Sequence, residues 1–150
     1  MNELKKRLYK QCLEYVEQRI RTAEDAIRSA KESSESDTKS SAGDKYETTR
    51  EMMQQEISRN EHQLIEAKKL LHALRTVNTA KSYTTAVPGA LVVTDHGTFF
   101  VSISAGQIEL EGKKYFTVAA SSPIGIRMKG LSQGHTFHFN QKDFKVLQIF

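Results

Sequence analysis

The histidines, the single cysteine and the acids of a serine-rich stretch are the residues whose types could do chemistry in this chain. Cys12 is the only cysteine, so neither an intramolecular disulfide nor a cysteine-based zinc site is expected. It has no base beside it in the sequence that would favour a catalytic thiolate. The five histidines are His62, His72, His96, His135 and His138.

The histidine spacings do not favour a metal site. His62 and His72 are ten residues apart on one expected helix, which does not bring them to ligand spacing. His135 and His138 are three apart near an expected strand, where they would face opposite sides. The chain also lacks a glycine-rich phosphate loop and a nucleophile elbow.

Carboxylates, the usual ligands of hard cations, gather in and beside the polar stretch from Ser33 to Asp44. The simplest interpretation of these acids is an ordinary solvated surface. They are Glu32, Glu35, Asp37 and Asp44.

Composition narrows the class of protein. The chain has 150 residues, 38% hydrophobic and 27% charged, with a formal net charge of +4. It has no run of about 20 apolar residues that could form a transmembrane helix, and its first residues lack the apolar core of a signal peptide. We therefore expect a cytoplasmic protein. Its basic residues are too sparse to make duplex binding the first expectation.

Two halves of the chain differ in composition, and we expect domains at residues 1–78 and 79–150. The first half has no proline, one glycine and many helix-forming residues, whereas the second holds all seven phenylalanines. The first half carries apolar residues at heptad spacing in two runs. These are Leu13, Val16, Ile20, Ala23, Ile27 and Ala30, then Met53, Ile57, Asn60, Leu64, Ala67, Leu71 and Leu74.

This seam predicts two long helices folded antiparallel, with a tip at about residues 33–44, where serines favour turns and caps. We interpret Asn60 on the seam as a register-setting residue, not a ligand. A coiled coil that pairs between chains, as a plain interaction module, is the alternative.

The second half predicts an α+β module, a small antiparallel sheet with one helix. We expect strands at residues 90–94, 98–103, 108–110, 115–119, 136–139 and 144–149. Ser122-Pro123 is expected to open the helix, with serine as its cap and proline in its first turn.

The stretch from Ser122 to His135 resembles the C-terminal signature of the Gre family of bacterial transcription factors, which begins with Ser-Pro and continues through an aliphatic residue, a small residue and an apolar turn to glycine. The segment Asp44–Glu51, with Tyr46 and Arg50-Glu51, resembles the start of the second hairpin helix in that family.

The resemblance implies an FKBP-like C-terminal module that docks on RNA polymerase at the rim of the secondary channel. It implies a hairpin that enters the channel, where a carboxylate pair at the tip helps to hold a second Mg²⁺ and promotes cleavage of backtracked RNA. The docking residues would be Ser121, Ser122, Pro123 and Ile124. The tip residues would be Glu35, Asp37, Lys39, Ala42 and Asp44. We expect a monomer that is no enzyme by itself, that has no contact with a membrane, and that meets nucleic acid only through the elongation complex.

The tip departs from the family. With the two aligned on Tyr46, the family's catalytic Glu falls at Ala42 and its catalytic Asp at Lys39. Neither side chain is a carboxylate, so we expect modulation of elongation or initiation without standard cleavage. Asp37 and Asp44, as shifted ligands of Mg²⁺ shared with the polymerase active site, are the alternative.

The docking segment departs as well. Ser121 stands where the family often has an acid before Ser-Pro, and His135 stands where it has Asp after the last glycine. Prolyl isomerase activity, which an FKBP-like module suggests, is not expected, because about 70 residues leave little wall for a substrate cleft.

Overall fold

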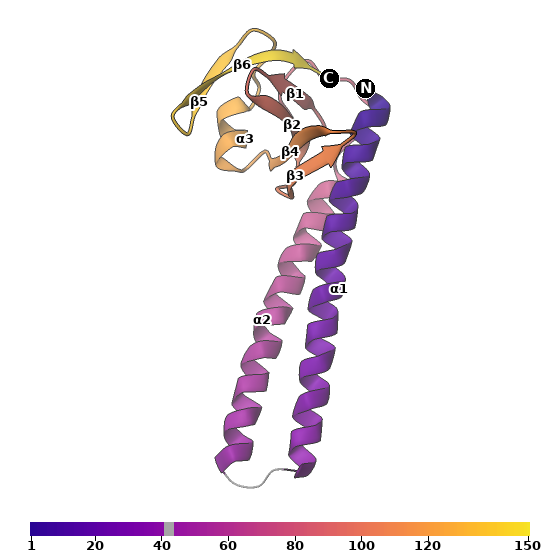
Figure 1. The fold of residues 1–150 in the computed structure, drawn as a ribbon, viewed down its shortest axis with the longest axis vertical. Coiled ribbons are helices and arrows are strands. Elements are labelled where there is room, and N and C mark those ends of the chain that lie inside the picture. Colours follow the sequence, from indigo (N-terminus) through magenta and orange to yellow (C-terminus); the bar gives the residue numbers. More distant parts are fainter. Residues whose placement is uncertain (41–43) are drawn as a thin grey trace. The chain divides into compact units, whose positions relative to one another are not determined.

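The computed structural model describes residues 1–40 and 44–150, and for residues 36–40 and 44–47 it describes only the backbone. Two helices, α1 (Asn2–Ser40) and α2 (Asp44–Arg75), precede six strands and a short helix (Figure 1). The chain forms two compact units. The hairpin unit is Val16–Leu71, and the sheet unit combines Met1–Tyr15 with His72–Phe150. Both helices therefore contribute to both units. None of the described helices is long and apolar enough to cross a membrane.

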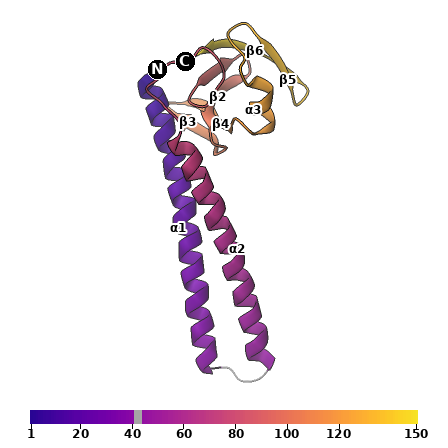
Figure 2. The ribbon, with the colours of Figure 1, turned by 180° about the vertical axis from the view of Figure 1, so that it is seen from behind.

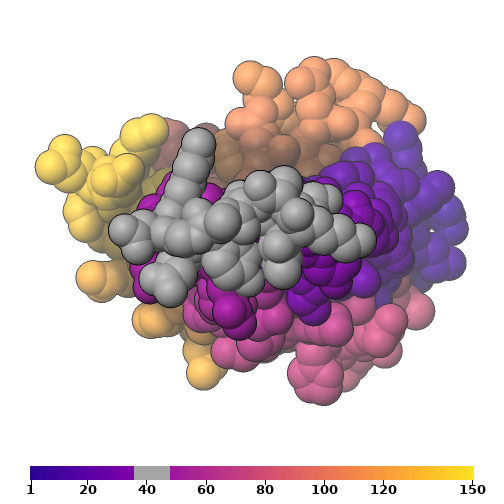
Figure 3. Space-filling model, turned by 90° about the horizontal axis from the view of Figure 1, so that it is seen from below, coloured from indigo at the N-terminus to yellow at the C-terminus, as the bar shows by residue number. Residues whose placement is uncertain are grey.

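The heptad seam of the two helices is confirmed. α1 and α2 lie side by side and antiparallel in both ribbon views (Figures 1 and 2). In the space-filling view from below, the indigo and purple atoms of α1 border the magenta atoms of α2 (Figure 3). Val16, Ala23 and Ala30 are buried, and every other seam position is buried or half-buried. The Asn60 amide donates to the carbonyl of Glu56 in its own helix at 2.9 Å. Asn60 is thus accommodated on the seam by a bond within α2.

The tip is shorter than the serine-rich composition predicts. α1 continues through Ser33 to Ser40, and α2 begins at Asp44. Serine is only about 0.5 kcal/mol less favourable than alanine inside a helix, so several serines do not end a helix that is already extended.

The sheet has the strand order β3-β4-β2-β1-β6-β5. Its strands are β1 (Leu91–Thr94), β2 (Gly97–Ser102), β3 (Gly106–Leu110), β4 (Lys113–Ala119), β5 (Thr136–Phe139) and β6 (Lys142–Ile149). The expected architecture, a helical hairpin followed by a small sheet with one helix, is confirmed. The sheet is mixed and not wholly antiparallel, because β2 and β4 pair in parallel. β3 lies at one edge of the sheet and pairs antiparallel with β4. β4 therefore lies between β3 and β2, and it runs in the same direction as β2.

Aromatic side chains pack on the face of the sheet that α3 (Pro123–Met128) helps to cover. Phe137 and Phe144 are cross-strand partners whose rings stack at 4.9 Å between centroids. Phe99 and Val146 join the same buried cluster, to which α3 contributes Met128. Burial of such side chains is the main favourable term for a small module of this kind.

Within the sheet unit, the start of α1 is held by an unusual buried lysine. Lys5 is 1% exposed, and its ammonium donates to the carbonyl of Lys81 at 2.8 Å. The same ammonium lies 4.8 Å from the centre of the Tyr83 ring, a cation–π distance. Burial lowers the pKa of Lys5, since desolvation disfavours its charged form. Gly89 leaves room for Tyr83, because a Cβ on Gly89 would lie 2.8 Å from the Tyr83 hydroxyl.

The buried Cys12 thiol gives a test of this packing. Its Sγ lies 3.8 Å from the Ser102 hydroxyl, and burial raises the pKa of the Cys12 thiol above its ordinary value. We expect a thiol reagent to leave the native chain unmodified at neutral pH and to label it fully in urea. A raised pKa in the folded state also means that stability falls as the pH rises past the unfolded thiol's pKa.

Urea unfolding at pH values on either side of that pKa measures the alkaline loss of stability. Cys12→Ala should reduce the dependence of the free energy of unfolding on pH. Labelling of the native thiol as fast as in urea would contradict the burial.

Candidate functional site

The Ser-Pro segment begins α3 as expected. The Ser122 hydroxyl accepts the Gly125 N–H at 3.1 Å and donates to the Ala119 carbonyl at 2.6 Å. It therefore caps the helix and ties its start to the end of β4. Pro123 occupies the first turn, where its missing N–H is not needed.

The four expected docking residues divide into two kinds. Ser121 and Pro123 are exposed. Ser122 is half-buried in its capping role, and Ile124 is half-buried against the core. Only Ser121 and Pro123 are therefore free to meet a partner without disturbing the packing.

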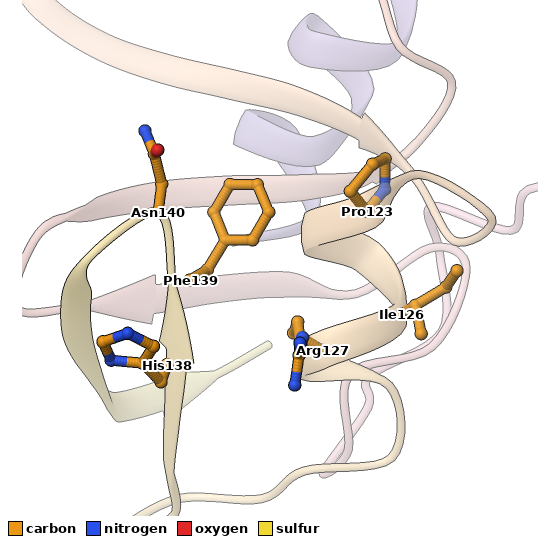
Figure 4. A pocket seen from close by; sticks show the side chains of 6 residues that line it. All are labelled: Pro123, Ile126, Arg127, His138, Phe139 and Asn140. Atoms are coloured by element: carbon orange, nitrogen blue, oxygen red, sulfur yellow. The ribbon is translucent and has the colours of Figure 1, made fainter.

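A cavity of about 530 Å³ lies between α3 and the hairpin of β5 and β6, and we call it the α3–β5 groove. Figure 4 shows Arg127 beside α3 on the side of the strand, with the Phe139 ring between Pro123 and His138. The groove is lined by Pro123, Ile126, Arg127, His138, Phe139 and Asn140.

The strand side of the groove carries a polar cross-strand pair. His138 and Asp143 are register partners on β5 and β6, and His138 Nδ1 lies 2.7 Å from Asp143 Oδ1. A carboxylate can only accept, so the imidazole donates in this contact. On the helix side, Ile126 is 62% exposed and leaves aliphatic surface uncovered beside the groove.

Backbone geometry at two positions sets the walls of the groove. A Cβ on Gly125 would collide with the Ala119 carbonyl oxygen, so glycine lets α3 approach the end of β4 closely. Asn140 and Gln141 both have positive φ, at 52° and 64°. Two consecutive left-handed residues are typical of the tight hairpin turn that matches strand twist, and they present Asn140 at the groove.

Sequence reasoning found one edge of this site and missed the rest. It selected Ser121–Ile124 but not Ile126, Arg127, His138, Phe139 or Asn140. Helical spacing was an available signal for two of them, because Ile126 and Arg127 follow Pro123 by three and four residues and share its side of α3. No local pattern indicated that the β5–β6 turn would meet that helix.

The expected tip residues fall largely outside the described side chains. Glu35 is exposed on α1. Asp37, Lys39 and Asp44 have a described helical backbone but not described side chains, and Ala42 lies outside the described residues.

The residues described near the tip do not fit a divalent cation. Glu24, Glu32 and Glu35 line a shallow cavity of about 320 Å³ together with Arg28 and Lys31, and these two cations offset most of the acids' charge and oppose the binding of a further cation. Across the described side chains, no three His, Cys, Asp or Glu residues come together as a metal-binding group.

No protein-family model matches the chain, and neither a curated protein nor a solved structure matches it at a significant level.

The close approach at Gly125 can be tested by substitution. We expect Gly125→Ala to destabilise the chain by about 3 kcal/mol, clearly more than the control below, because its methyl group would collide with a backbone carbonyl. Gly106→Ala is the matched control: its Cβ meets no neighbour, and only its φ of +82° opposes alanine, at a cost of about 1 kcal/mol. Urea unfolding of both variants measures the difference, and equal losses would contradict the steric account.

Proposed function

We propose that this chain is a Gre-like factor that binds RNA polymerase at the secondary channel and modulates elongation or initiation without standard stimulation of transcript cleavage. The observation that carries the proposal is an order of parts: an antiparallel helical hairpin, then a sheet module whose one helix opens at a capped Ser-Pro.

The sheet module supplies a surface suited to docking. Pro123 and Ser121 are exposed at the start of α3, and the exposed Ile126 extends the apolar surface along the helix. Exposed apolar groups beside a polar rim are typical of protein-binding surfaces.

The hairpin favours this proposal over an interaction module that pairs between chains. The described seam positions of α1 and α2 are buried or half-buried within one chain, and Arg19 Nη2 donates to Gln63 Oε1 across the pair at 3.3 Å. A seam already used within the chain leaves less apolar surface for a second copy.

The tip sequence is the reason for proposing no cleavage. Lys39 and Ala42 stand where the family has its carboxylates, and neither supplies an oxygen ligand for Mg²⁺. A factor of this kind acts by occupying the channel and not by adding a metal ligand.

Retention on immobilised core RNA polymerase tests docking. We expect the native chain to be retained, and Pro123→Asp to weaken retention by about tenfold, a loss of about 1.4 kcal/mol. An acid in the first turn suits the helix dipole, so this variant keeps α3 while placing charge on the apolar surface. Gln107→Glu on the exposed part of β3 adds the same charge elsewhere and should bind normally. Failure of the native chain to bind would remove the polymerase proposal.

A backtracked elongation complex with Mg²⁺ tests the tip. We expect no more RNA shortening with the chain than with polymerase alone, because the carboxylate pair is missing. Shortening that disappears in the double variant Asp37→Ala, Asp44→Ala would instead establish the alternative with shifted tip acids. Native retention on polymerase, measured in parallel, shows that the factor was bound in the assay.

A further inference from the structure

Positive charge is concentrated in the segment that builds the α3–β5 groove. Residues 119–150 contain four lysines or arginines and a single acid, Asp143, whereas residues 79–118 contain three basic and three acidic residues. The net excess in the C-terminal half therefore belongs to α3, β5, β6 and their connections. The four basic residues are Arg127, Lys129, Lys142 and Lys145.

The lining of the groove has a cation but no carboxylate. Arg127 lines it, and among the described residues Arg127 has no ion-pair partner. The only acid of the segment, Asp143, is already within 2.7 Å of the His138 ring. Arg127 is thus the one lysine or arginine of the lining, and among the described residues its guanidinium is available to a partner.

Apolar surface lies beside that cation. Ile126 is 62% exposed next to Arg127 on α3, Pro123 is exposed one turn earlier, and Phe139 is half-buried at the end of β5. A guanidinium next to an uncovered aliphatic patch fits a partner that offers a carboxylate and an apolar side chain together.

We propose that the α3–β5 groove binds an acidic protein segment, with a carboxylate of that segment on Arg127 and an adjacent apolar side chain on Ile126 and Pro123. This inference rests on the proposed function, since Pro123 belongs to both surfaces, and it gives the chemical class of the docking element on the polymerase. Specificity comes from charge complementarity, and the apolar contact supplies most of the affinity.

A nucleic-acid strand fits the groove less well. Strand binding needs a row of cations that follows successive phosphates and open aromatic faces on which bases stack. The lining offers one arginine, the ring of Phe139 is half-buried, and the exposed ring of His138 is bonded to the Asp143 carboxylate, which repels a phosphate. Isoleucine and proline provide contact area but no stacking surface for a base.

Fluorescence anisotropy with defined probes tests the groove in the full chain. The probes are a labelled peptide of alternating Glu and Leu, the same peptide with Lys in place of Glu, and an oligouridine. We expect binding of the Glu-Leu peptide that weakens with added salt, since an exposed ion pair is screened, and no binding of the other two probes. Binding of the Lys-Leu peptide or the oligouridine in preference would overturn the proposal.

Matched variants locate the binding. Arg127→Glu and Ile126→Ser should each lower the affinity for the Glu-Leu peptide by about tenfold or more. Lys113→Glu, an equal reversal of charge at an exposed residue outside the groove, should leave binding within about twofold of native. Equal binding by Arg127→Glu and native protein would overturn the proposal. Titration of the native chain with the peptide, followed by NMR, tests the same site without substitution. We expect the largest changes in amide chemical shift at Ile126, Arg127 and Phe139, and changes confined to other residues would also overturn the proposal.

The polymerase experiment separates this inference from the proposed function. If the native chain binds the Glu-Leu peptide through Arg127 but is not retained on core polymerase, the groove stands and the polymerase proposal falls. If the polymerase retains both Arg127→Glu and Ile126→Ser as well as it retains native protein, and neither substitution weakens peptide binding, the groove inference falls and the polymerase proposal stands.

Discussion

The close contact between α3 and the end of β4 is the constraint on which the candidate site depends. The Ala119 carbonyl accepts the Ser122 hydroxyl, and it also lies against Gly125, where no side chain would fit. A helix of six residues is not stable alone in water, so its position follows from this contact and from the buried Met128. One short helix thereby presents Pro123 and Arg127 to the same groove.

α1 illustrates how one amphipathic helix serves two kinds of packing. Beyond Val16 it pairs with α2 through small and branched side chains, whereas its first residues belong to the sheet unit. There the buried face includes Leu8, Cys12 and Lys5. The lysine costs desolvation energy, and the Lys81 carbonyl and the Tyr83 ring offset part of it. An apolar side chain there would avoid the desolvation cost but would lose both of these contacts.

The chemistry of the two candidate regions is different in kind. The described residues near the tip mix acids with Arg28 and Lys31, which suits a solvated surface better than a metal site. The α3–β5 groove joins a cation to uncovered apolar groups, which suits recognition of a protein surface. The function proposed for the chain therefore depends on binding. The sheet unit would select the partner, and the hairpin would take no part in a chemical reaction.

The sequence by itself determined the elements whose signals are local. The heptad period placed Val16, Ala23 and Ala30 in the seam, and Ser122-Pro123 placed the start of α3, because both signals act within a few residues. The serine-rich stretch misled, since serine's weak helix propensity was outweighed by a helix already formed. Only the tertiary structure decided the parallel pairing of β2 with β4 and the meeting of α3 with the β5–β6 turn. The strand pairing and the helix contact both depend on segments that are distant in the sequence. Packing and hydrogen bonding between such segments decide them, and local propensity does not.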